Sequence, residues 1–227
     1  YMRLVDTTEA SEIAGVDLNY DALYLPQSGS VSPKKLWQAY MSGVDYHLNA
    51  RVDDFSAIKA DAVVLACGPA VKAFAPDLPI GSVRGQITDV KASELSRDVK
   101  CTICYGGYFS PVRDDLHIVG STFQRWLDHS DIVEQDDHDN IAKLAETIPG
   151  LQQGLEIVGH RAPVRATSKD HFPIVGALEE GVYVSAAHGS HGILSTIMSA
   201  HLLTDMILDR PRCLSLPTIE ALSPARF

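Results

Sequence analysis

The stretch GVYVSAAHGSHGILSTIMSAHLL, residues 181–203, limits the folds open to this chain more than any other. Its alternating start predicts a strand, residues 188–192 a tight turn, and the apolar run from about Ile193 a long helix. Bare N–H groups at a helix start, beside glycines that permit close approach, suit anionic or carbonyl oxygens. A strand-to-helix turn without any ligand is the alternative, and the motif alone does not decide between them.

The remaining patterns predict an α+β chain with a large mixed, mostly antiparallel sheet. ADAVVLACGP (60–69) is typical of a buried strand that ends in a glycine. Alternating or β-branched runs predict strands at 44–52, 82–90, 100–112, 115–123 and 171–178, with Asp114-Asp115 as a hairpin turn. Residues 155–167 are expected to form a strand that crosses into a loop. Helices are expected at 8–15, from Ser32-Pro33 to about Ser42, and at 134–147, where the acidic start EQDDHD suits a helix N-terminus.

Composition narrows the possible partners. Lys and Arg number 19 against 29 Asp and Glu, a net charge of −10, which opposes nonspecific binding to nucleic acid or anionic membranes. Cys101 and Cys104 have zinc-type spacing but lack a second pair, so no metal site is expected. No apolar run is long enough to span a bilayer and no secretory signal is visible. The four cysteines do not look like a disulfide framework, so we expect a reduced, cytoplasmic environment. The sequence begins at Tyr1, and we expect it to be a piece of a longer protein.

Several motifs together resemble a known family. VRATSKDHFPIVG followed by residues 181–203 resembles the carboxy-terminal part of the FAD-dependent amine oxidoreductases of the D-amino-acid oxidase and glycine oxidase superfamily. LYLPQSGSVSPKKL, LPIGSVRGQITDV, HRAPVRATSKDHFPIVG and the terminal LSPARF resemble the FAD domain of the bifunctional bacterial proteins that make methylaminomethyl-thiouridine at the tRNA wobble position. The likeness runs from about residue 4 to the end.

The resemblance implies a partial FAD-dependent oxidoreductase domain over residues 1–227. A substrate lobe is expected at about 1–45 and 80–176, and the remnant of a Rossmann-like FAD lobe at about 46–79 and 177–212. The family's GxGxxG turn, which holds the ADP half of FAD, is not in this sequence. FAD is the implied cofactor, and whether this chain alone retains it stays open.

The resemblance also implies site residues. Arg165 matches the arginine that pairs with the substrate carboxylate, and its planar guanidinium suits that group. Tyr108 matches a tyrosine that helps to hold the carboxylate, and Arg161 is either the neighbour of Arg165 or a partner of an acid on the adjacent strand. The implied cofactor-binding residues are Gly68, Pro69, Arg84, Gly85, Gln86, His188, Gly189, Ser190, His191, Gly192 and Ile193.

The implied reaction is the FAD-dependent oxidation of a secondary amine, which removes the carboxymethyl group from carboxymethylaminomethyl-uridine in tRNA. Because the chain is acidic, we expect the basic surface for tRNA in parts outside it or in a fused or partner methyltransferase domain. Two alternatives remain: a glycine- or sarcosine-type oxidase of small amines, and a non-catalytic substrate or interaction lobe without cofactor.

Overall fold

The computed structural model describes residues 1–227, which divide into two compact units. Unit 1 comprises residues 1–36, 84–124 and 129–163, and unit 2 comprises residues 37–83, 125–128 and 164–227. Several mostly antiparallel sheets combine with helices, so the expected α+β class is confirmed.

The chain starts with a small β–α–β motif in unit 1, made of β1 (Arg3–Val5), α1 (Thr7–Ala14) and β2 (Ala22–Tyr24). The Asp6 side chain accepts a hydrogen bond from Glu9 N at 2.9 Å and caps the helix. Gly15 ends it at φ +80°, and a Cβ there would lie 2.0 Å from the Asp98 carbonyl oxygen. The expected helix at 8–15 therefore ends at its glycine because no side chain fits.

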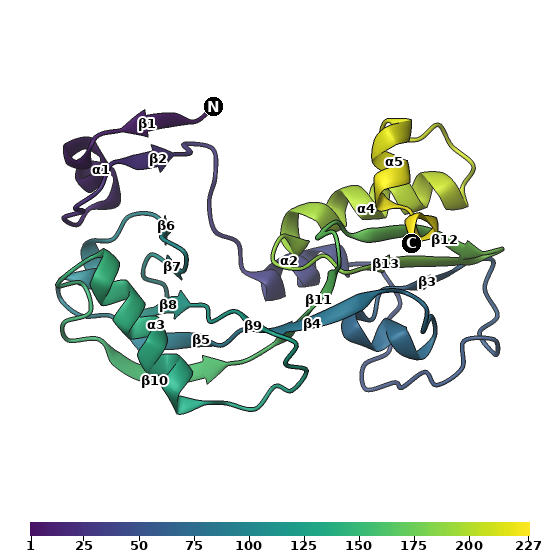
Figure 1. Ribbon diagram of the computed structural model, residues 1–227, viewed down its shortest axis with the longest axis horizontal. Helices are drawn as coiled ribbons and strands as arrows, with labels where there is room; N and C mark the ends of the chain where they lie inside the picture. The colour runs from purple at the N-terminus through teal and green to yellow at the C-terminus, as the bar shows by residue number, and fades with distance from the viewer. The chain divides into compact units, whose positions relative to one another are not determined.

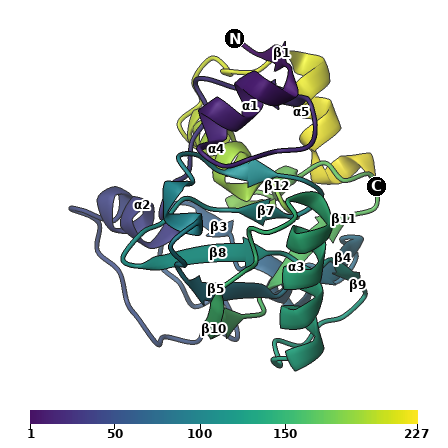
Figure 2. The same cartoon turned by 90° about the vertical axis from the view of Figure 1, so that its left-hand side faces the viewer.

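Unit 1 is built on a five-stranded antiparallel sheet. Its strand order is β10 (Glu156–Arg161), β5 (Ile87–Lys91), β8 (Leu116–Gly120), β7 (Tyr108–Phe109) and β6 (Ile103–Cys104). Helix α3 (Glu134–Thr147) lies across the face of these strands (Figure 2). Buried Val90, Phe109, Val119, Leu144 and Ile148 form the core between helix and sheet. The predicted helix at 134–147 and the hairpin turn at Asp114-Asp115 are confirmed.

Two predicted strands, 100–112 and 44–52, are wrong. The predicted strand at 82–90 divides between β4 (Ile80–Arg84) and β5, and the stretch 155–167 contains the two strands β10 and β11 (Val164–Ser168). Residues 100–112 form the β6–β7 hairpin instead of one strand, because Gly106 turns the chain at φ +82° and Gly107 comes too close to Gly120 for a side chain. A Cβ on Gly107 would lie 2.8 Å from the Gly120 carbonyl oxygen. Residues 44–52 form no strand: their alternating apolar side chains are exposed and no neighbouring strand pairs with them.

Unit 2 centres on the sheet β12 (Ile174–Glu179), β13 (Val182–Ala186) and β3 (Val63–Leu65), in that order. Strand β13 runs parallel to β3 and antiparallel to β12. Helix α4 (Gly192–Ile207) runs along the sheet and α5 (Leu216–Leu222) packs beside it (Figure 1). Strands β11 (Val164–Ser168), β4 (Ile80–Arg84) and β9 (Gln124–Arg125) form a second sheet. The remaining helix is α2 (Pro33–Tyr40).

The unit boundaries differ from the expected lobes. Residues 37–45, 80–83, 125–128 and 164–176, which we expected in the substrate lobe, group with unit 2. The reason is packing: Ile80 and Ala166 are buried in the same core as Leu65, Ile174 and Val184. The functions that we expected of the two lobes stay predictions.

The terminal motif LSPARF is fastened to the loop before β12. Arg226 donates from Nε to Asp170 Oδ2 at 2.8 Å and from Nη2 to Asp170 Oδ1 at 3.1 Å. Nη2 also donates to the Phe172 carbonyl oxygen at 3.0 Å. Hydrogen bonding from Arg226 holds the pKa of the Asp170 carboxyl well below its usual range. Two of the motifs that carried the family resemblance are therefore physically joined.

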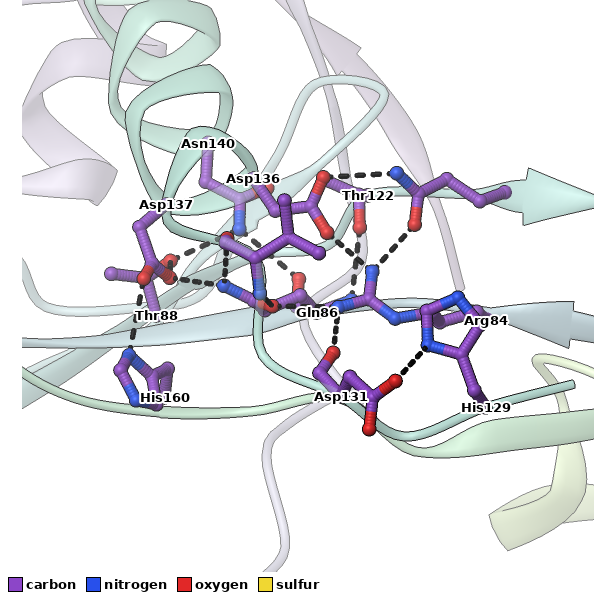
Figure 3. Close-up of polar contacts among 12 residues, drawn as sticks. Arg84, Gln86, Thr88, Thr122, His129, Asp131, Asp136, Asp137, Asn140 and His160 are labelled. Carbon is purple, nitrogen blue, oxygen red and sulfur yellow. Dashed lines mark hydrogen bonds and ion pairs between the residues drawn. The ribbon is translucent and has the colours of Figure 1, made fainter. Parts of the chain in front are cut away.

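A buried polar network joins α3 to Arg84 and β5 within unit 1 (Figure 3). Arg84 is fully buried, and its guanidinium pairs with the Asp136 carboxylate in the first turn of α3. Arg84 Nη2 donates to Gln86 Oε1 at 2.8 Å, and Gln124 Nε2 donates to Asp136 Oδ1 at 2.9 Å. The pair is thus surrounded by neutral hydrogen-bonding groups, as a buried ion pair requires.

Asp137 forms the second half of this network. Its Oδ1 accepts from Gln86 Nε2 at 2.8 Å and from Thr88 Oγ1 at 2.7 Å, and its Oδ2 lies 3.1 Å from His160 Nδ1. Asn140 Nδ2 donates to the Gln86 carbonyl oxygen at 3.0 Å. The acidic run at the helix start therefore has a second role besides its favourable interaction with the helix dipole, because two of its carboxylates fix α3 against the sheet.

We expect Asp136→Ala to lower the free energy of unfolding by about 3–5 kcal/mol, since it leaves the buried Arg84 charge without its carboxylate. Urea titration measures this change. Asp115→Ala is the matched control: it breaks the exposed Arg97–Asp115 pair and should cost about 0–1 kcal/mol. Equal losses for the two variants would contradict the importance given to the buried pair.

Candidate cofactor and substrate site

The bend between β13 and α4 has the strand–turn–helix form that its sequence predicts. Strand β13 ends at Ala186, and α4 begins at Gly192. Between them Gly189 takes φ +56°, in the left-handed region that favours glycine. Its N–H donates to the Ala166 carbonyl oxygen at 3.0 Å, and Thr167 forms a β-bridge with His188. The bend is thereby tied to strand β11.

His188 is held from both sides by hydroxyl groups. Its Nε2 lies 3.0 Å from Ser185 Oγ and its Nδ1 lies 2.9 Å from Ser195 Oγ. Ser195 Oγ is also within 3.1 Å of the His191 carbonyl oxygen, to which it can donate. This arrangement favours a neutral ring in which Nδ1–H donates to Ser195 and Nε2 accepts from Ser185. Burial lowers the pKa of His188, which also favours the neutral ring.

A cavity of about 510 Å³ opens beside this bend in unit 2. Its volume is within the range of small-molecule and cofactor sites. The cavity lies where the parallel strands β3 and β13 end, which is the usual ligand-binding edge of such sheets. The lining is mostly apolar and consists of Val64, Ala66, Gly68, Pro69, Val164, Ala166, Ser185, Ala186, Ala187, His188, Gly189, Thr196, Ala200, Leu203, Thr204 and Ile207.

Four of the predicted cofactor-binding residues meet at this cavity. Gly68 and Pro69 approach it from the end of β3, and His188 and Gly189 from the bend. Gly68 has φ +59°, and a Cβ there would meet no atom within 4 Å, so its backbone is open to a ligand. The other predicted members of the turn, Ser190, His191, Gly192 and Ile193, do not line the cavity.

Arg165 lies half-buried on β11, between two residues that line the cavity. Since side chains alternate along a strand, Val164 and Ala166 face the cavity and Arg165 faces the other side of β11. Thr167 shares the face of Arg165 and lies near the bend: a Cβ on Gly189 would be 3.6 Å from Thr167 Cγ2. Arg165 is therefore not among the residues that line this cavity, and its role toward the substrate stays a prediction.

Arg84, Gly85 and Gln86 have structural contacts. The side chains of Arg84 and Gln86 are fully buried in the network with α3, and Gly85 N donates to the Pro163 carbonyl oxygen at 3.1 Å. These side chains are therefore engaged within the fold, and the predicted place of the three residues beside the cofactor stays a prediction.

The last two predicted catalytic residues lie in unit 1, whereas Arg165 lies in unit 2. Tyr108 is half-buried on β7. Arg161 is exposed at the end of β10 and forms no ion pair, so the alternative of a salt bridge to a neighbouring acid is not realised. Ser185 and Ser195, which hold His188, escaped sequence reasoning because a lone serine carries no signal until a strand and a helix bring it beside a ring nitrogen.

The structure gathers no group of three or more His, Cys, Asp or Glu side chains that could hold a metal ion. None of the helices combines the length and the apolar character that crossing a bilayer requires.

Comparison with known proteins places these features in a family. The model of the FAD dependent oxidoreductase family matches residues 1–206. The tRNA 5-methylaminomethyl-2-thiouridine biosynthesis bifunctional protein MnmC of Chromobacterium violaceum is 30% identical over 278 aligned residues, which cover 100% of this chain and 42% of the relative. The MnmC protein of Idiomarina loihiensis is 28% identical, with 100% of this chain and 41% of the relative covered. The chain thus spans about two fifths of the length of these relatives.

Among solved structures, glycine oxidase from Geobacillus kaustophilus superimposes with a TM-score of 0.85 at 21% identity, covering 100% of this chain and 67% of that chain. This likeness concerns the fold. The family match, over nearly all of the sequence, settles membership: the chain belongs to the family of FAD-dependent oxidoreductases.

Proposed function

We propose that this chain is part of a flavoenzyme that oxidises the secondary amine of a carboxymethylaminomethyl group on the wobble uridine of tRNA. The observation that carries the proposal is the family match over residues 1–206, together with MnmC relatives that align along the whole chain. The name of those relatives points to a modified uridine of tRNA, and the family resemblance implies the carboxymethylaminomethyl group on it. A fused or partner methyltransferase and a cytoplasmic location belong to the same proposal.

The cavity beside the bend fits part of a flavin cofactor. Its apolar walls suit a flat aromatic group, and the bare backbone at Gly68 and Gly189 allows close approach. The N–H groups at the start of α4 lie directly after the bend and favour partial negative charge. We therefore assign Gly68, Pro69, His188 and Gly189 to the binding of FAD.

When bound, FAD would supply the acceptor for the hydride that leaves the methylene carbon between nitrogen and carboxylate. Loss of that hydride from the neutral amine gives an iminium ion. Addition of water to its carbon, followed by cleavage of the carbon–nitrogen bond, releases the protonated aminomethyl base and glyoxylate. The protein's own contribution is to hold the substrate in one orientation. His188 donates to Ser195 and accepts from Ser185, so it fixes the bend rather than moving a proton.

Arg165 is the residue that we assign to the substrate carboxylate. Guanidinium offers two parallel donors to a carboxylate, and a half-buried position strengthens such bonds relative to water. Tyr108 and Arg161 lie in unit 1, and their roles toward the substrate stay predictions from the family resemblance. Gly189 lines the cavity and is also close to the face of β11 that carries Arg165, because a Cβ on Gly189 would lie 3.6 Å from Thr167 Cγ2.

We expect Ala66→Trp to reduce the affinity for FAD at least about tenfold, because a large ring at the end of β3 fills the cavity. Flavin absorbance and fluorescence during titration with FAD measure the affinity. Ala70→Trp is the matched control, since Ala70 is also exposed, follows in the same turn, and does not line the cavity. A protein that takes up no FAD, or variants of equal affinity, would contradict the assignment of the cavity.

We expect Arg165→Ala to lower kcat/KM for the carboxymethylaminomethyl RNA by roughly 10- to 150-fold. This range corresponds to the loss of about 1.5–3 kcal/mol, which hydrogen bonds to a charged group contribute. Arg165→Lys should recover part of it, because a single donor replaces two. Steady-state kinetics of the flavin-loaded protein measure the effect, with exposed Lys169→Ala as control. Unchanged kinetics for Arg165→Ala would remove the residue from this role.

Oxidation of glycine or sarcosine but not of the RNA would favour the small-amine alternative.

A further inference from the structure

Trp126 is a highly exposed tryptophan that the roles assigned so far do not use. It follows strand β9 within unit 2 and is 79% exposed. Its backbone N–H donates to the Ser82 carbonyl oxygen at 2.8 Å, so the residue is aligned beside strand β4. Its φ of +71° is a value that a bulky residue seldom adopts, and such outliers concentrate at functional sites.

The indole ring of Trp126 is supported from one side by the sheet. A Cβ on Gly81 would lie 3.2 Å from Trp126 Cζ3 and 3.8 Å from Cε3, so the ring occupies the space that a glycine on β4 leaves open. The same Cβ would lie 3.5 Å from Thr167 Oγ1. The ring and the Thr167 hydroxyl are therefore on one face of the paired strands β4 and β11.

Arg165 is on this face as well. It precedes Thr167 by two positions on β11, and residues two apart on a strand point to the same side, roughly 7 Å from each other along it. One face of unit 2 thus combines the Arg165 guanidinium with the Trp126 ring. One side of this ring lies against β4, and most of its surface is exposed. In the proposed substrate, an arm of CH₂, NH and CH₂ links the uracil ring to the carboxylate.

We propose that Trp126 is the stacking platform for the uracil base of the substrate, while Arg165 binds the carboxylate at the other end of the same arm. The inference rests on the proposed function and deepens it, because it names the residue that distinguishes a nucleobase-bearing amine from a free one. An aromatic side chain that offers an open ring face binds unpaired bases by stacking. Glycine and sarcosine have no ring and gain nothing from Trp126.

The test uses the flavin-loaded protein and an anticodon stem-loop RNA that carries carboxymethylaminomethyl-uridine. We expect Trp126→Leu to raise KM for this RNA roughly 5- to 150-fold, the range that loss of one stacking aromatic produces. Trp126→Tyr should restore most of the affinity, because it keeps a ring. Trp37→Leu is the control: Trp37 is 45% exposed in the same unit and packs edge-to-face on Tyr46.

Two outcomes separate the inference from the function beneath it. If the wild-type protein oxidises the RNA and Trp126→Leu leaves its KM unchanged, the stacking platform is overturned and the proposed function stands. If the wild-type protein does not oxidise the RNA, both are overturned. A Trp126→Leu variant that loses RNA affinity, with flavin content and unfolding midpoint as in Trp37→Leu, supports the platform against a merely structural role.

Discussion

The buried ion pair between Arg84 and Asp136 is the constraint on which the order of unit 1 depends. A fully buried guanidinium is tolerated only where a carboxylate and further acceptors surround it, and α3 supplies the carboxylate from its first turn. The helix is therefore held by a directional contact at its N-terminal end and by apolar packing along the rest of its length. Gln86, directly before β5, and Thr88 on β5 join the same network, so the position of α3 and the register of β5 are fixed together.

In unit 2 the corresponding role falls to hydrogen bonds around the bend after β13. His188 connects a strand serine to a helix serine, and Gly189 connects the bend to β11. These contacts place bare backbone at the mouth of an apolar cavity without the use of any charged group. Such a site can accept a large flat ligand, and its few polar groups are already engaged with one another, which leaves shape to determine what binds.

The sequence predicted the elements that local residues determine, and it failed where contacts between residues far apart in the chain decide the structure. Helix 134–147, the turn at Asp114-Asp115 and the strand–turn–helix at 181–203 were predictable because local periodicity and turn residues determine them. The β6–β7 hairpin was missed because the reason for its break, the close approach of Gly107 to Gly120, is a contact between strands. Residues 44–52 alternate like a strand but have no partner to pair with.

The candidate site shows the same difference between local patterns and long-range contacts. The glycines of the bend were visible in the sequence, and the family resemblance pointed to Arg165, but the face on which Arg165 lies became clear only from its neighbours in β11. Trp126 carried no sequence signal, because its exposed ring matters only when Gly81 lies behind it.

The ion pair between Arg226 and Asp170 has a consequence for how related sequences diverge. The two residues are 56 positions apart, yet each is the other's main partner, and Arg226 also holds the Phe172 carbonyl. Losing either charge alone leaves the other in a partly covered position with no counterion. Related sequences that change one residue should therefore also change the other. Positions 170 and 226 are expected to covary.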